Sequence, residues 1–195
     1  MAPAVRARHM KTVLAAVDAL APEQAPAVRE RFGAAALRAV EDASAVEWLD
    51  LGLNLSLTRA IEEVLGRAGC HRLFRSQLDE ALQTPVFRAI VDGAIALFGL
   101  DPSSWARFIP SGWGLVFREV GRWSVEHNAP GELQLALADL PPATVVDDVW
   151  PASVAASLGA LVGLARAEGG VQLAAMDRGR RLARYTLAWT PRARR

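Results

Sequence analysis

The sequence contains a single cysteine, Cys70, and this scarcity excludes two kinds of structure. No disulfide can form within the chain, and a zinc site built on several thiolates has too few ligands. A reducing, cytoplasmic location is therefore expected. Lysine is also scarce, since Lys11 is the only one among 22 basic residues. This preference for arginine, together with abundant alanine, indicates a GC-rich bacterial genome.

An excess of either charge and a long apolar run are also lacking. The 22 Lys and Arg residues face 21 Asp and Glu residues, and the formal net charge of +1 argues against a nucleic-acid-binding protein. The longest stretch without charge, residues 149–165, is interrupted by Pro151, Gly159 and Gly163. This stretch favours a buried helix, and no integral membrane segment is expected.

Apolar residues are abundant, at 52% of the sequence against 22% charged. This composition is typical of a globular protein with a sizeable core, and 195 residues suit one domain. We expect a single domain over residues 1–195. Within it, residues 1–44 or so should form a helical extension, and residues 45–190 or so an α+β core.

Helical periodicity dominates the first two thirds of the chain, and strand alternation follows it. Ser44 and Glu47 are expected to start the third helix as a capping box. Predicted helices cover 5–20, 26–40, 45–65, 71–82, 85–98, 105–120 with an interruption at 110–112, and 151–168, which ends at Gly169-Gly170. Predicted hairpins pair 122–127 with 132–137 and 171–176 with 182–189. The fold class is therefore α+β, with an N-terminal helical bundle followed by antiparallel hairpins packed with a long helix.

No motif of a catalytic or metal site occurs at the required spacing. Gly112 and Gly114 lack the third glycine of a dinucleotide-binding loop. Asp147 and Asp148 are adjacent, so their side chains should diverge, and a solvated loop is expected there. The three histidines form no metal-binding pair. Neither catalytic nor metal-ligating residues are predicted.

Cys70 and His71 lie at a predicted helix start, where the helix dipole can lower the pKa of a thiol. Consecutive helical residues point about 100° apart, so His71 is poorly placed as a base for Cys70. Two interpretations stay open, a reactive thiol and a small buried hydrophobic residue.

Residues 53–65, LNLSLTRAIEEVL, and 69–75, GCHRLFR, resemble the core of the small TRAPP vesicle-tethering subunits. In that family a G-x-R-L-I-E-D-F-L helix leads into a G-R-C-H-D-F turn. The order of helices, hairpin, long helix and hairpin also matches. The resemblance implies a fold shared with the four-vinyl-reductase ligand-binding domain and, more distantly, with the haem-nitric oxide binding domain. The chain is also similar to a myxobacterial paralogous family of unknown function.

The resemblance implies a ligand site at Cys70, which matches the TRAPP cysteine that can hold an acyl chain in an apolar tunnel. We add four residues from our own reading of the sequence. Phe74 and Leu78 follow Cys70 at helical spacing, and Trp105 and Trp113 supply aromatic faces.

The sequence also departs from these relatives. Arg72 stands where the TRAPP motif has aspartate. The Y-x-S-x-R signature of the haem-binding relatives is absent, because Tyr185 is the only tyrosine and Thr-Leu-Ala-Trp follows it. No cofactor is therefore expected apart from a bound lipid or acyl chain, and haem is not expected.

These observations together predict a non-enzymatic sensor or adaptor domain that binds a hydrophobic small molecule or lipid in an apolar pocket near Cys70. A homodimer or another protein partner is expected, and nucleic acid is not. Two alternatives stay open: a homodimeric interaction scaffold without a ligand, and a thiol-dependent enzyme.

Overall fold

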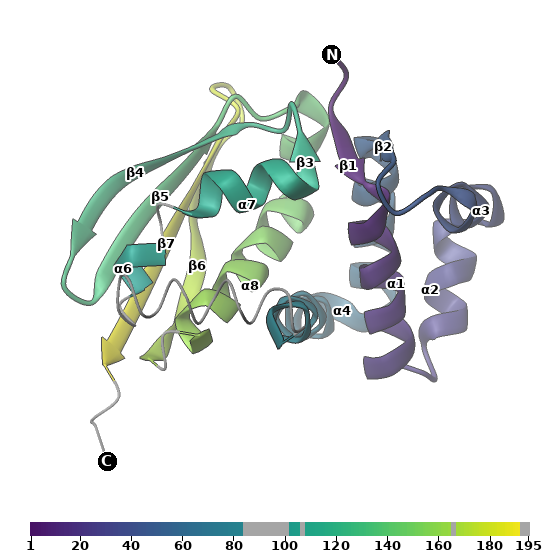
Figure 1. The fold of residues 1–195 in the computed structure, drawn as a ribbon, viewed down its shortest axis with the longest axis horizontal. Helices are drawn as coiled ribbons and strands as arrows, with labels where there is room; N and C mark the ends of the chain where they lie inside the picture. Colours follow the sequence, from purple (N-terminus) through teal and green to yellow (C-terminus); the bar gives the residue numbers. More distant parts are fainter. Residues whose placement is uncertain (84–101, 106–107, 165–166, 192–195) are drawn as a thin grey trace.

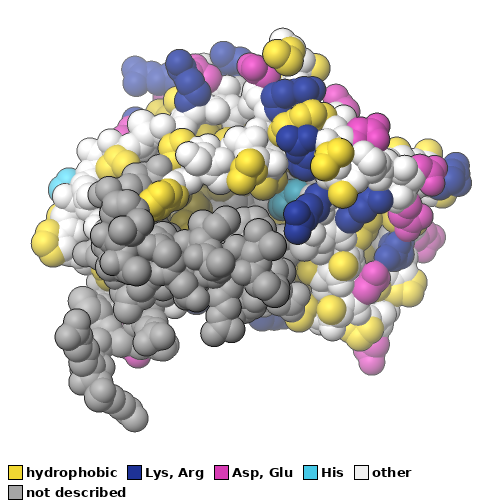
Figure 2. All heavy atoms as spheres, viewed as in Figure 1, with side chains coloured by type: hydrophobic (Ala, Val, Ile, Leu, Met, Phe, Trp, Pro, Cys, Tyr) yellow, Lys and Arg dark blue, Asp and Glu magenta, His cyan; other side chains and the backbone are white. Residues whose placement is uncertain are grey.

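The computed structural model describes residues 1–83, 102–105, 108–164 and 167–191. Helices α1 to α3 lie at one end of the molecule and a four-stranded sheet at the other, with α4 and α8 between them (Figure 1). On the face drawn in Figure 2, side chains of both charges are interspersed, in keeping with the net charge of +1. The predicted α+β class is confirmed. The described helices are α1 (Ala7–Leu20), α2 (Ala25–Phe32), α3 (Ala34–Asp42), α4 (Leu51–Gln83), α6 (Pro102–Trp105), α7 (Ile109–Val116), the 3-10 helix η2 (Pro142–Val145) and α8 (Val149–Leu164).

The chain begins with a strand where a helix was predicted. Strand β1 (Ala4–Arg6) is the centre of a three-stranded antiparallel sheet, between β2 (Trp48–Asp50) and β3 (Phe117–Arg118). Val5 is fully buried there and lies opposite both Leu49 and Phe117. These partners are distant in sequence, so the local helical pattern does not reveal them.

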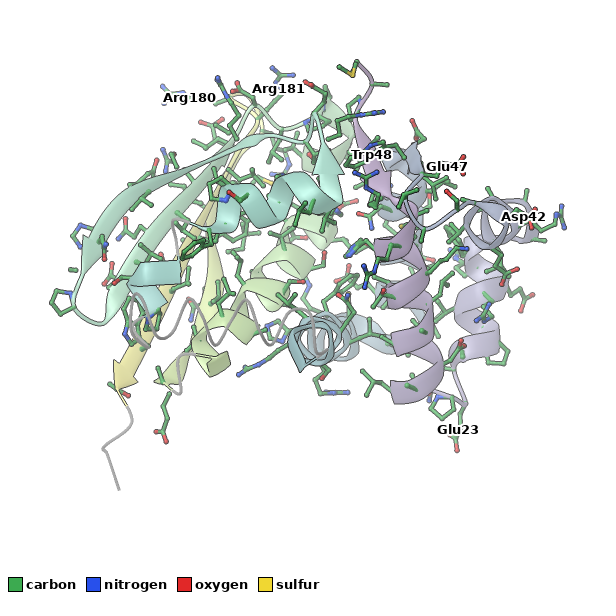
Figure 3. The ribbon with its side chains drawn as sticks, viewed as in Figure 1. Glu23, Asp42, Glu47, Trp48, Arg180 and Arg181 are labelled. Carbon is green, nitrogen blue, oxygen red and sulfur yellow. The ribbon has the colours of Figure 1, made fainter. Side chains whose placement is uncertain are left out.

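The third predicted helix starts later than expected. Glu47 does accept a hydrogen bond from the backbone N–H of Ser44 at 3.1 Å, but the two residues form a turn that leads into β2. Glu47 and Trp48 lie beside β1 (Figure 3). Helix α4 begins at Leu51, and the carboxylate of Asp50 caps it by accepting the N–H of Gly52 at 2.7 Å. The predicted start at Ser44 is therefore wrong, because Asp50 supplies the cap.

Glycine and proline divide the helices only in part as predicted. Gly33, with φ of +93°, splits the predicted helix 26–40 into α2 and α3. Gly66, with φ of +68°, kinks α4 where a break was predicted. Pro110 does not interrupt α7 but lies in its first turn, where its missing N–H is tolerated. The predicted helix 85–98 lies outside the described residues.

Both predicted hairpins are confirmed. Strands β4 (Arg122–Ala129) and β5 (Glu132–Ala138) form one, and β6 (Ala167–Asp177) and β7 (Leu182–Pro191) form the other. Pairing of β5 with β7 joins them into an antiparallel sheet of order β4-β5-β7-β6. Gly169 was expected to end a helix but lies in β6, where an added Cβ would come 2.1 Å from the carbonyl oxygen of Ala188. The close approach of β7 therefore requires glycine.

One hydrophobic cluster runs through the molecule, from Val5 of β1 to Trp189 of β7. It includes buried residues of α1, α4, α8 and the larger sheet. This cluster does not test the division into a helical extension, residues 1–44 or so, and an α+β core, residues 45–190 or so, which stays a prediction. Among the residues described, no helix is both long and apolar enough to span a membrane.

Candidate ligand site at Cys70

Cys70 lies just beyond the Gly66 kink of α4 and is buried, with 5% of its surface exposed. It borders a cavity of about 90 Å³ between α4 and α8. Helix α8 contributes Val149, Ala152 and Ser153 to the cavity wall. Glu62, Arg67 and His71 of α4 complete the wall, so the cavity is small and partly polar, and an apolar pocket beside Cys70 stays a prediction.

The Cys70 thiol is not activated. Burial and, to a smaller extent, the nearby carboxylate of Glu62 raise its pKa to about 12, against the opposing effect of Arg67. The thiol is therefore uncharged at neutral pH, and a thiolate is the nucleophilic form of cysteine. The expectation that the helix start lowers this pKa is wrong, because burial removes the water that would solvate the thiolate.

The other predicted site residues whose side chains are described do not line this cavity. Phe74 is buried and Leu78 partly buried on α4, but neither lines the cavity. Trp113 lies on α7, away from the cavity wall. The side chain of Trp105 lies outside the described part of the chain. The sequence located the cysteine, but helical spacing alone did not identify the residues that face it.

Trp113 belongs to an aromatic cluster. Its ring centre lies 4.3 Å from that of Phe117, 5.4 Å from Trp123 and 6.0 Å from Trp150. Its Nε1–H donates to the carbonyl oxygen of Val120 at 2.9 Å. This arrangement indicates a structural role in joining α7, the larger sheet and α8.

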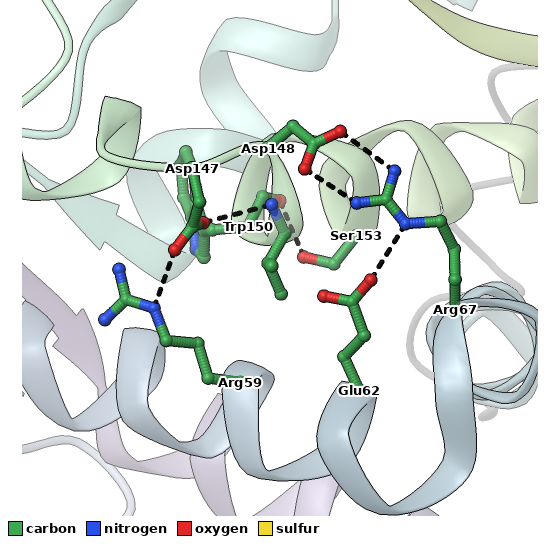
Figure 4. Close-up of polar contacts among 8 residues, drawn as sticks. Arg59, Glu62, Arg67, Asp147, Asp148, Trp150 and Ser153 are labelled. Carbon is green, nitrogen blue, oxygen red and sulfur yellow. Dashed lines mark hydrogen bonds and ion pairs between the residues drawn. The ribbon is translucent and has the colours of Figure 1, made fainter.

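Glu62 and Arg67 of the cavity wall belong to a network of charged side chains between α4 and the start of α8 (Figure 4). Arg67 donates to both carboxylate oxygens of Asp148, at 2.7 and 2.9 Å, and to Glu62 at 2.8 Å. This pairing lowers the pKa of Asp148. Arg59 donates to Asp147 at 2.9 Å. Asp147 and Asp148 lie in a partly exposed bend before α8, as expected of a solvated loop, and their ion pairs connect this bend to α4.

No short-range signal could have identified this network. Asp148 lies 81 residues from Arg67, and Asp147 lies 88 residues from Arg59. Asp147 also accepts the N–H of Val149 at 3.1 Å, at the first turn of α8. The position of Asp147 just before a helix is the one local feature that predicts this contact with the helix start.

Comparison with known proteins gives a match in structure but not in sequence. No family model and no curated protein matches the chain. The Fe(II) unliganded H-NOX protein from K. algicida superposes with a TM-score of 0.67 at 9% identity, over 95% of this chain and 96% of that chain. A mutant of the same H-NOX protein superposes with a TM-score of 0.68 at 9% identity, over 96% and 97%. The chain therefore has an H-NOX-like fold. The TRAPP, four-vinyl-reductase and myxobacterial resemblances stay predictions.

The expectation that haem is absent is contradicted by these neighbours, which are H-NOX proteins in the Fe(II) form. Histidine, cysteine, methionine and tyrosine are the usual protein ligands of haem iron. Among the described residues, Cys70 and His71 border a cavity of only about 90 Å³, and a larger cavity of about 370 Å³ is lined by none of the four types. The lining of these two cavities assigns no axial ligand.

Proposed function

We propose that this chain is a non-enzymatic sensor domain that binds a small ligand in the cavity beside Cys70. The observation that carries the proposal is the cavity itself, which lies where α4 packs on α8 and has an uncharged thiol in its wall. The H-NOX-like fold supports a sensing role.

The size of the cavity limits the ligand. A dry cavity of about 150 Å³ in another protein accepts benzene or xenon. The cavity at Cys70, with about 90 Å³, suits an apolar molecule of a few non-hydrogen atoms. A ligand of this size would touch both Cys70 of α4 and Ala152 of α8.

The charged network offers a route from ligand to response. The Arg67–Asp148 pair joins the two helices that enclose the cavity. A ligand that fits one spacing of α4 and α8 better than another shifts the population toward that spacing. The Arg67–Asp148 pair would then form or break with occupancy.

A non-enzymatic role is supported by the chemistry of the site. At pH 7 a thiol with a pKa of about 12 provides almost no thiolate. Within the described ranges, no group of three or more His, Cys, Asp and Glu residues could hold a metal ion.

Xenon is a suitable probe of the cavity. We expect xenon to shift the NMR signals of Cys70 and Ala152 in a saturable way. Ala152→Leu, which fills the cavity, should abolish the shifts, and the nearly isosteric Cys70→Ser should keep them. Unchanged signals in the wild-type protein, or equal shifts in Ala152→Leu, would contradict the proposed site.

The purified protein tests the remaining parts of the proposal. Its mass under native and then denaturing conditions reports subunit number and bound molecules, and its absorption spectrum and iron content report a haem.

A homodimer is the proposed assembly, because β4 is an edge strand of the larger sheet and exposes half of Val125. A monomeric mass would contradict the dimer. The cytoplasmic location stays a prediction.

A further inference from the structure

A second and larger cavity, of about 370 Å³, lies on the face of α4 away from Cys70. Gly69, Arg72 and Ser76 line it at spacings of three and four residues, which place them on one helical face. Cys70 points about 100° away from Gly69. The opposite wall comes from the end of α1, at Leu20, and from Gln24 before α2. The volume lies within the range of small-molecule sites, about 300 to 1,000 Å³.

Glycine keeps the floor of this cavity open. A Cβ added at Gly69 would lie 2.7 Å from the Cβ of Leu65 and 4.0 Å from Nη2 of Arg72. The Arg72 guanidinium therefore reaches back over Gly69 to the cavity floor.

The lining combines apolar walls with one positive charge. Leu20, Val64 and Leu73 supply apolar surface, and Arg72 is the only charged residue of the lining. None of the ion pairs formed between described residues involves Arg72. Asp18, near the end of α1, is already paired with Arg29 at 2.7 Å. The guanidinium is therefore available to an anion.

We propose that this cavity binds a small organic carboxylate, with its apolar body against Leu20, Val64 and Leu73 and its carboxylate on Arg72. A guanidinium pairs well with a carboxylate, and it is exposed at this site, where an anion can reach it. The site is separate from the Cys70 cavity, so either site can be absent without affecting the other.

Octanoate is the probe, titrated into the isotope-labelled full chain and followed by NMR. We expect saturable shifts of the Gly69 and Ser76 amide signals. Arg72→Gln should weaken binding at least about tenfold, because a charged hydrogen bond is lost. The control, Arg180→Gln, removes the same charge at the tip of the β6–β7 hairpin, far from Glu23 at the turn beside the cavity (Figure 3). It should bind octanoate as the wild type does.

Two further measurements make the result decisive. Ser76→Trp, which fills the cavity from a partly buried position, should abolish the shifts. The neutral analogue 1-octanol should bind the wild type no more tightly than octanoate binds Arg72→Gln. The proposal is overturned if wild-type Gly69 and Ser76 show no saturable shift, or if Arg72→Gln binds octanoate as tightly as Arg180→Gln does.

Discussion

Two polar side chains, the buried Tyr185 and the half-buried His9, lie beside aromatic rings. The ring of Tyr185 is 5.3 Å from that of Trp123, and the ring of His9 is 5.6 Å from that of Phe117. Burial raises the pKa of Tyr185 and lowers that of His9 to about 4. Both side chains are therefore uncharged at neutral pH.

Tyr185→Phe should leave the protein as stable or more stable. The Tyr185 side chain is fully buried, and its hydroxyl finds no hydrogen-bond partner in the described structure. Removing an unpaired buried hydroxyl should raise the free energy of unfolding, measured in urea, by up to about 1 to 2 kcal/mol. Tyr185→Ala, which also leaves a cavity, should lower it by about 3 to 5 kcal/mol. A loss above about 1 kcal/mol in Tyr185→Phe would show that the hydroxyl has a partner, such as a bound water.

His9 should make the protein less stable as the pH falls. Its pKa is about 4 in the folded protein against 6.5 in the unfolded chain, so between these values the unfolded chain binds a proton that the folded protein does not. The neutral form of His9 contributes to the free energy of unfolding fully above pH 6.5. This contribution should decline by about 2 to 3 kcal/mol as the pH falls to 4.

The difference between wild type and His9→Gln isolates this effect from the titration of carboxylates. Urea unfolding from pH 7 to pH 4 should show a shallower decline for His9→Gln than for wild type. The control is His71→Gln, at an exposed position, which should follow the wild-type profile. Identical profiles for wild type and His9→Gln would rule out the lowered pKa.

Among the elements, α4 is the one on which the candidate site depends. Its kink at Gly66 separates two helical segments, and the second carries Arg67 and Cys70. The pair between Arg67 and Asp148 joins that segment to the start of α8. Because the pair is half exposed, it should add no more than about 1 kcal/mol to stability. The kink is therefore expected to matter more than the ion pair.

Gly66→Ala should destabilise the protein. At φ of +68° and ψ of +168°, Gly66 has a backbone conformation that is almost restricted to glycine. We expect a loss of about 1 to 3 kcal/mol in the free energy of unfolding. Gly112 of α7 is a matched control, since an added Cβ at either glycine meets open space. Gly112→Ala should stabilise its helix by about 0.5 to 1 kcal/mol. Equal effects of the two substitutions would contradict the kink.

At the scale of the whole molecule, the buried side chain of Asn54 connects the N-terminal helix α1 to helix α8 in the C-terminal half. Asn54 of α4 has 2% of its surface exposed. Its amide nitrogen lies 3.4 Å from the sulfur of Met10 in α1, and its amide oxygen accepts the indole N–H of Trp150 in α8 at 2.8 Å. One side chain therefore connects three helices.

Asn54→Ala should cost about 1 to 3 kcal/mol, because the indole N–H of Trp150 is left buried and unpaired. A double-mutant cycle with Trp150→Phe should give a coupling of about 1 kcal/mol or more in urea unfolding. The control is Thr58→Val, which removes a hydrogen bond that stays within α4 and should cost less. Additive effects of Asn54→Ala and Trp150→Phe would show that the contact contributes nothing.

The local pattern was sufficient for the fold class and for both hairpins. Period-two alternation and turn residues lie within each hairpin, so its pairing needs no distant information. Strand β1 could not be predicted in this way, because its partners lie more than 40 residues along the chain. The start of α4 at Leu51 likewise depends on the pairing of β2 with β1.

The sequence by itself determined the helices with strong periodicity and the break at Gly66, because each depends on neighbours within a turn or two. It left two interpretations of Cys70 open, and the burial of this residue became clear only from the structure. Only the tertiary structure decided what Cys70 faces, how Asp147 and Asp148 are paired, and which face of α4 borders the larger cavity. These features arise where α4 meets α1 and α8, and the spacing of residues along one helix does not specify which helix will pack against it.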